Sequence, residues 1–164
     1  MSDELQYASR MSDADALMWS IEKDPLLRST ITTVMVLDGP IDHDRFLHTM
    51  ERATRVIPRL RQRVRSNPLS LAPPRWEIDP HYDLQYHIRW TRAAGDGTFR
   101  DLLSMAEPIA MQGFDRARPL WEVAVVEGLD DGGTALIMKV HHSITDGVAG
   151  VRMMLEIFDF ERDD

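Results

Sequence analysis

The sequence predicts an α+β domain, in which a mixed or largely antiparallel sheet packs with helices. Segments with the alternating pattern of strands and segments with the spacing of helices both occur, and they do not follow a regular βαβ rhythm. The 164 residues are enough for one domain with a buried core. No repeat, low-complexity tract or internal boundary divides them, so a single domain is expected.

The first predicted elements are a short helix and a strand. Ser12 and Asp15 have the spacing of a capping box, which predicts a helix that runs to about Glu22 and stops at the Asp-Pro pair of residues 24–25. The run 29–37 is rich in Thr, Val and Ile, and an Asp-Gly-Pro turn follows it. This run is therefore predicted to be a strand.

The next predicted elements are a long helix and an extended segment. From Asp42 to Pro58, apolar residues recur at helical spacing. From Arg59 to Arg65, four arginines alternate with Leu60, Gln62 and Val64, which predicts an extended chain with one strongly basic face.

A further strand and a second long helix are predicted in the middle of the chain. Residues 84–90 alternate in the manner of a half-buried strand. After Gly97, Thr98 and Asp101 form a second capping box, and Pro108 is expected to bend or fray the end of the helix that they start. The buried stripe predicted for this helix consists of Phe99, Leu102, Leu103, Ala106 and Ala110.

The last predicted elements are a hairpin and a helix. Residues 121–127 and 134–140 are apolar and flank a turn of Gly and Asp residues, so they are predicted to pair. After Gly147, apolar residues at helical spacing predict a final helix that runs into the acidic end 161–164.

Composition excludes several classes of function. The net charge of −8, from 19 Lys and Arg against 27 Asp and Glu, argues against a nucleic-acid partner. There is no cysteine, so a thiolate nucleophile is excluded. No signal peptide and no membrane-spanning helix are predicted. We therefore expect a cytoplasmic location, with any membrane contact peripheral.

The chemically most informative segment is 139–147, where an apolar strand runs into a polar loop and then a helix. Adjacent side chains of a strand point to opposite faces, so only one of His141 and His142 can face a given cleft. A neutral imidazole can take a proton from a hydroxyl near neutral pH, and His142, nearer the loop, is the better candidate base. Asp146 could hold the loop through its carboxylate, and Gly147 allows a tight turn into the helix.

Three other interpretations of the same residues are possible. A zinc site needs three or four convergent ligands, but no third ligand stands at a recognisable spacing. A serine hydrolase that uses Ser143 lacks the G-x-S-x-G turn that exposes such a hydroxyl. The third interpretation is purely structural, with both histidines satisfying hydrogen bonds at a strand end. Two histidines, an aspartate and a glycine at this spacing favour a catalytic loop instead.

The segment HHSITDG resembles the HHxxxDG signature of the chloramphenicol-acetyltransferase-like acyltransferases. Other segments resemble the bifunctional wax ester synthase/acyl-CoA:diacylglycerol acyltransferase family, and the resemblance covers nearly the whole chain. These segments are MSDADALMW (11–19), PRLRQRV (58–64), PRWEIDPHYDLQYH (74–87) and FDRARPLW (114–121). The expected fold is thus a chloramphenicol-acetyltransferase-like lobe.

The resemblance implies a role for each residue of the motif. It makes His142 the general base, Asp146 mainly structural, and His141 and Gly147 supporting residues of the loop. The implied reaction transfers a long-chain acyl group from acyl-CoA to diacylglycerol or a fatty alcohol, without an acyl-enzyme, a metal or a cofactor other than acyl-CoA as co-substrate. The PLW segment also matches a family motif, and Trp121 is expected to be a core residue there.

The resemblance also implies partners. Family members have two lobes, so residues 1–160 are expected to form the N-terminal acyltransferase lobe and 161–164 to begin an inter-lobe linker, with the C-terminal lobe absent. The exposed inter-lobe surface then predicts self-association or a separately encoded C-terminal lobe. The expected partners are acyl-CoA and a lipid alcohol, met at the inner membrane or lipid droplets, and no nucleic acid.

Two alternatives to the leading interpretation stay open. The chain could be a non-catalytic acyl-CoA or lipid-binding truncated paralogue, which would keep the same fold. A condensation or polyketide acyltransferase with carrier-bound thioesters is disfavoured by the segments outside HHSITDG. For the arginines of residues 59–65, a solvated strand face is favoured over contacts with CoA phosphates.

Overall fold

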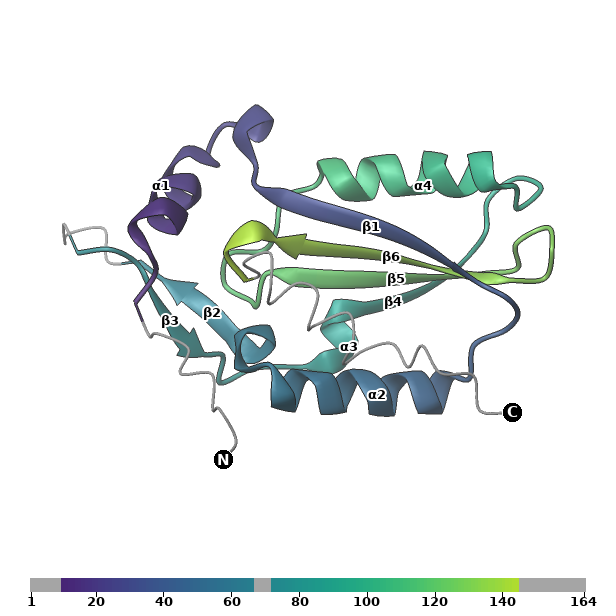
Figure 1. The fold of residues 1–164 in the computed structure, drawn as a ribbon, viewed down its shortest axis with the longest axis horizontal. Coiled ribbons are helices and arrows are strands. Elements are labelled where there is room, and N and C mark those ends of the chain that lie inside the picture. Colours follow the sequence, from purple (N-terminus) through teal and green to yellow (C-terminus); the bar gives the residue numbers. More distant parts are fainter. Residues whose placement is uncertain (1–9, 67–71, 145–164) are drawn as a thin grey trace.

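The computed structural model describes residues 10–66 and 72–144, which form a four-stranded sheet, a two-stranded sheet and the helices that pack on them (Figure 1). In chain order the elements are α1 (Asp13–Ile21), the 3-10 helix η1 (Pro25–Leu27), β1 (Thr30–Leu37), α2 (His43–Val56), η2 (Pro58–Arg61), β2 (Gln62–Arg65), β3 (Arg75–Ile78), α3 (Leu84–His87), β4 (Ile88–Arg92), α4 (Phe99–Met111), β5 (Trp121–Glu127), β6 (Thr134–His141) and η3 (His142–Ile144).

The larger sheet has the strand order β1-β6-β5-β4. Strand β6 pairs antiparallel with both β1 and β5, whereas β4 pairs parallel with β5. The predicted mixed sheet and the predicted hairpin of β5 and β6 are confirmed. Strand β1 closes one edge, and its first residue, Thr30, lies opposite His141 at the end of β6.

The sheet has a core on each face, because side chains alternate along its strands. On one face, Leu136 and Met138 of β6 pack in the cluster that contains Phe46 and Met50 of α2. On the other face, Ala135 and Ile137 pack in the cluster that contains Leu102 and Ala106 of α4 (Figure 1). His141, the last residue of β6, continues this alternation, and His142 begins the 3-10 helix η3 directly after the strand.

The predicted helix starts are confirmed by their hydrogen bonds. The Ser12 side chain accepts a hydrogen bond from the Asp15 N–H (3.1 Å) at the start of α1. Thr98 and Asp101 form a complete capping box at the start of α4, in which each side chain accepts from the other residue's N–H. Helix α4 continues past Pro108 to Met111.

Two predicted extended segments are partly wrong. Residues 58–61 form η2, and only Gln62–Arg65 is a strand. Residues 84–87 form one helical turn before β4, because the Asp83 side chain accepts from the Gln85 N–H (3.0 Å) and caps that turn. In both cases a residue that favours the start of a helical turn, Pro58 or Asp83, outweighs the alternating pattern of the residues that follow.

The predicted buried stripe of α4 is wrong in part. Leu102 and Ala106 are buried, but Phe99 and Leu103 are 60% and 46% exposed. Met105 and Ile109 pack against the core in their place. Apolar residues surround much of the axis of α4, so the sequence of the helix alone does not specify which side faces the core. Packing against the sheet specifies it. The predicted final helix lies outside the described residues.

Trp121 belongs to the core on the sheet face that packs against α2. Its exposed fraction is 3%, its indole Nε1–H donates to the Leu60 carbonyl (2.8 Å), and its ring stacks on that of His87 with centroids 4.5 Å apart. The predicted core role of this residue is confirmed. His87 is itself buried, and its Nδ1 lies 2.8 Å from the Trp121 carbonyl oxygen.

Burial of His87 makes stability depend on pH. Burial lowers the pKa of His87 below the ordinary 6.5, and this outweighs the hydrogen bond to the Trp121 carbonyl, which acts in the opposite direction. The unfolded chain therefore binds the proton more readily than the folded one. The contribution of neutral His87 to the free energy of unfolding is therefore full above pH 6.5 and is lost as the pH falls below 6.5.

We expect His87→Phe to flatten this dependence. Below pH 6.5 the slope of the unfolding free energy should fall, by up to about 1.4 kcal/mol per pH unit, the value for one proton. Urea denaturation of both proteins between pH 7.5 and 5 measures the two slopes. Equal slopes would mean that His87 does not titrate differently on folding.

Candidate active site

The two histidines of the motif lie where β6 ends, between the starts of its neighbouring strands. The His141 N–H donates to the Leu120 carbonyl before β5 (3.0 Å), and the His142 N–H donates to the Ser29 carbonyl before β1 (2.8 Å). The backbone is thus held from both sides. The two side chains differ in exposure: His141 at the end of β6 is buried, and His142 at the start of η3 is exposed.

The His141 ring is bonded at both nitrogens. Nδ1 lies 3.1 Å from the Ser143 amide nitrogen and 2.6 Å from the Ser143 Oγ, and Nε2 bonds to the Oε1 of Glu22. Since the Ser143 N–H can only donate, Nδ1 is an acceptor, and the ring proton is assigned to Nε2, which faces the carboxylate. His141 therefore acts as a structural link.

Glu22 follows α1 directly as its C-terminal cap, and its carboxylate accepts from the Ser29 N–H (2.8 Å) as well as from His141. Burial raises the pKa of this carboxyl, but the hydrogen bonds from His141 and Ser29 and the nearby charge of Arg116 lower it more, and the net pKa lies below the ordinary 4.5. Glu22 is thus an anion at neutral pH.

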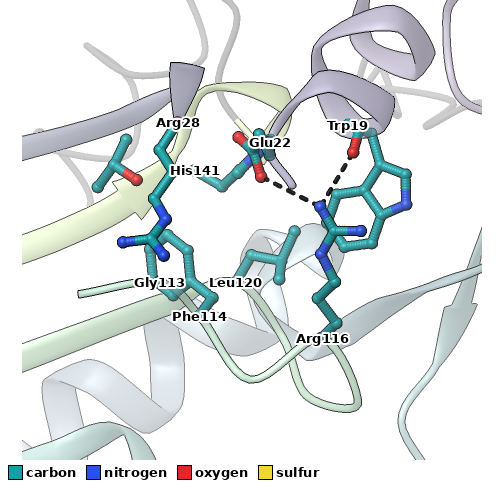
Figure 2. A pocket seen from close by; sticks show the side chains of 9 residues that line it. Trp19, Glu22, Arg28, Gly113, Phe114, Arg116, Leu120 and His141 are labelled. Atoms are coloured by element: carbon teal, nitrogen blue, oxygen red, sulfur yellow. Dashed lines mark hydrogen bonds and ion pairs between the residues drawn. The ribbon is translucent and has the colours of Figure 1, made fainter. Parts of the chain in front are cut away.

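A cavity of about 120 Å³ adjoins this link (Figure 2). Glu22, His141, Arg28 and Phe114 are among the residues that line it. Arg116 crosses its wall: it donates to the Trp19 carbonyl (3.0 Å), lies 3.7 Å from the Glu22 carboxylate, and stacks over the Trp19 ring. His141 lines the cavity and His142 does not.

The exposed His142 ring is the group of the motif that is available for chemistry. No residue in the described ranges forms a hydrogen bond or an ion pair with its ring. Ser143, His141 and Glu22 have the composition of a hydrolase triad, but the Ser143 N–H and Oγ approach the same His141 nitrogen. The two Ser143 donors share the one lone pair of that nitrogen, at 2.6 Å for Oγ and 3.1 Å for the N–H, which differs from a triad, where the imidazole accepts from the hydroxyl alone.

The sequence predicted this site in part. The structure brings His141 and His142 to the end of β6 as expected, while Asp146 and Gly147 lie outside the described residues. Glu22 was missed, since it contacts His141 across 119 positions of sequence. Its signal was local: an acidic residue ends a helix whose last turn holds no basic residue, which is unfavourable for the helix dipole.

The arginines of residues 59–65 have partners in the structure. Arg61 bonds to Glu51 on α2, and Arg63 bonds to Glu77 on β3 (2.8 Å). Arg59 is buried over the Trp76 ring. The basic strand face predicted from the alternation is therefore largely neutralised by acidic neighbours.

Two further observations concern metal ligands and membrane spans. Within residues 10–66 and 72–144, no three His, Asp or Glu side chains are grouped closely enough to share a metal ion. None of the helices in the same ranges has both the length and the apolar character that a membrane span requires.

Comparison with known proteins assigns the chain to a family. Residues 11–164 match the wax ester synthase/diacylglycerol acyltransferase catalytic domain. The chain belongs to this family. The resemblance of the HHSITDG segment and its companions is thereby confirmed, and the family is one of acyltransferases.

Two curated relatives of the chain come from Mycobacterium tuberculosis. A Mycobacterium tuberculosis H37Rv protein provisionally named diacylglycerol O-acyltransferase Rv2484c is 43% identical over 158 residues, which are 96% of this chain and 32% of the relative. A second from the same strain, provisionally named diacylglycerol O-acyltransferase tgs1, is 34% identical over 79% of this chain and 28% of its own length. The chain thus spans about a third of these relatives' length.

Solved structures confirm the predicted fold. The wax ester synthase/diacylglycerol acyltransferase of Marinobacter aquaeolei VT8 is 29% identical and superposes with a TM-score of 0.68 over 88% of this chain and 37% of its own. The starter condensation domain of rhizomide synthetase shares the fold at 14% identity, with a TM-score of 0.73 over 92% of this chain and 34% of its own. The chloramphenicol-acetyltransferase-like architecture is therefore confirmed.

Proposed function

We propose that this chain supplies the base-bearing lobe of an O-acyltransferase that moves a long-chain acyl group from acyl-CoA to a diacylglycerol or a fatty alcohol. The products would be triacylglycerol or wax ester. The proposal combines the acyltransferase family with the names of its relatives. Because those relatives are about three times as long, the remaining lobe is expected from a second part of the enzyme.

The observation that carries this proposal is the exposed imidazole of His142 on a fixed backbone. In the proposed reaction the alcohol oxygen attacks the thioester carbonyl carbon while His142 takes the hydroxyl proton. The tetrahedral intermediate collapses, the carbon–sulfur bond breaks, and the proton passes from His142 to the departing CoA thiolate. The step needs no oxidant, metal or acyl-enzyme, and a single positioned base serves both proton transfers.

The substrates suggest where the reaction occurs. Diacylglycerols and fatty alcohols partition into lipid, so we propose peripheral contact with a membrane or a lipid droplet from the cytoplasmic side. Two alternatives, self-association and a separately encoded lobe, would each supply a second lobe. The competing function is a binding module that holds acyl-CoA without turning it over.

Ester formation tests the function directly. The chain is incubated with radiolabelled palmitoyl-CoA and vesicles that contain either dioleoylglycerol or hexadecanol, alone and together with the C-terminal two thirds of Rv2484c. We expect labelled triacylglycerol or wax ester in at least one arm, with release of free CoA in equal amount. Palmitoyl-CoA binding without ester in any arm would overturn the proposal in favour of the binding module.

A further inference from the structure

The backbone on either side of His142 is tied to one carboxylate oxygen. Oε1 of Glu22 accepts from the Ser29 N–H (2.8 Å), and the carbonyl of Ser29 accepts from the His142 N–H (2.8 Å). The same Oε1 bonds to Nε2 of His141, whose Nδ1 accepts from the Ser143 N–H (3.1 Å). Residues 141, 142 and 143 are therefore all connected to Glu22.

This carboxylate is placed at a cost to its own helix. It follows the last turn of α1, where the helix dipole disfavours negative charge and where α1 has no basic residue. The compensation comes from outside the helix, through His141, the Ser29 N–H and Arg116. A negative charge that is unfavourable for its own helix, but is paired with groups from β6 and from the start of β1, is typical of a functional site.

We infer that Glu22 is a positioning residue for the general base: it fixes the Nε2–H tautomer of His141 and thereby the backbone that presents His142. This inference rests on the proposed function. Glu22 does not touch the substrate, and it acts through His141 and Ser29 only. The charged and titratable neighbours that face it are His141 from β6 and Arg116 from the segment before β5, with Arg28 across the cavity.

Three substitutions separate this role from general destabilisation. Glu22→Gln keeps an oxygen that can accept from both Ser29 and His141, so the geometry should survive. Glu22→Leu removes both acceptors, and Glu22→Asp shortens the side chain so that one oxygen cannot serve both donors. Glu51→Leu is the matched control, because Glu51 is likewise a carboxylate paired with arginine, here Arg55 and Arg61, but lies on α2.

The first measurement is magnetic resonance of the full chain and does not require catalysis. We expect the ¹⁵N spectrum of His141 to show a protonated Nε2 in the wild type and in Glu22→Gln, and a mixture of tautomers in Glu22→Leu. Hydrogen exchange at the His142 amide should become about tenfold faster in Glu22→Leu, the change expected for one weakened hydrogen bond. Glu51→Leu should match the wild type. If Glu22→Leu does not fold, Glu22→Asp must show the same changes in smaller degree.

The second measurement is turnover in the ester assay. We expect Glu22→Leu to lower kcat by about 10- to 100-fold with KM nearly unchanged, because a base displaced by a fraction of an ångström loses rate and not binding. Glu22→Gln should restore kcat to within a few-fold of the wild type. A wild type that binds palmitoyl-CoA but forms no ester in any arm would overturn the proposed function, while the resonance data still decide the role of Glu22. Unchanged tautomer and exchange in the Leu and Asp variants, or equal changes in Glu51→Leu, would overturn the inference.

Discussion

Replacing His142 by alanine is expected to lower the rate of ester formation by about 10²- to 10⁴-fold, the usual contribution of a positioned general base. The alcohol hydroxyl is a poor nucleophile while it keeps its proton, and the exposed imidazole at residue 142 is the group proposed to remove it. The fold should remain intact, because the described residues form no bond to this ring and its backbone N–H bond to Ser29 does not depend on the side chain.

His48→Ala is the matched control for this substitution. His48 is an exposed histidine on α2, and its loss should leave the rate unchanged. The measurement is the initial rate of labelled ester under saturating palmitoyl-CoA, together with the far-ultraviolet circular dichroism of each variant. A His142→Ala protein that forms ester at the wild-type rate would show that another group takes the proton.

The two histidines of the motif show what the sequence could and could not predict. The expectation that only one of the two histidines faces a cleft came from local rules, strand alternation and nearness to the loop, and the structure shows His141 buried and His142 exposed. The partner of the buried histidine is not a local matter. Glu22 reaches His141 across 119 positions, and no spacing in the sequence joins a helix end to a strand end so far away.

The same division holds for the fold. Side-chain caps such as that of Thr98 involve neighbours three residues apart, and they were predicted correctly. The hairpin was predicted because its two strands flank a short turn. The rotation of α4 and the pairing of β1 beside β6 depend on packing between distant segments, and the pattern of α4 alone misplaced Phe99 and Leu103. Asp146 and Gly147 stay predictions from the family motif.

The largest loss of stability is expected from Trp121→Ala, at about 3 to 5 kcal/mol, which is the range for truncating a buried tryptophan. The substitution removes the ring that stacks on His87 and leaves a cavity in the core between the sheet and α2. It also leaves the Leu60 carbonyl without its indole donor. A domain of this size has a total stability of about 5 to 15 kcal/mol, so a large share of it would be lost.

Trp121→Phe separates the ring from the hydrogen bond. Phenylalanine keeps most of the buried ring but cannot donate to the Leu60 carbonyl, so a cost of about 1 to 3 kcal/mol is expected for the unpaired acceptor. Trp90→Phe is the control, because Trp90 is half-buried and no hydrogen bond from its indole is found among the described residues. Urea denaturation at pH 7.5 measures the three variants against the wild type. If Trp121→Phe lowers the free energy of unfolding no more than Trp90→Phe does, the indole hydrogen bond between η2 and β5 does not stabilise the fold. The loss in Trp121→Ala would then reflect the cavity and the lost stacking alone.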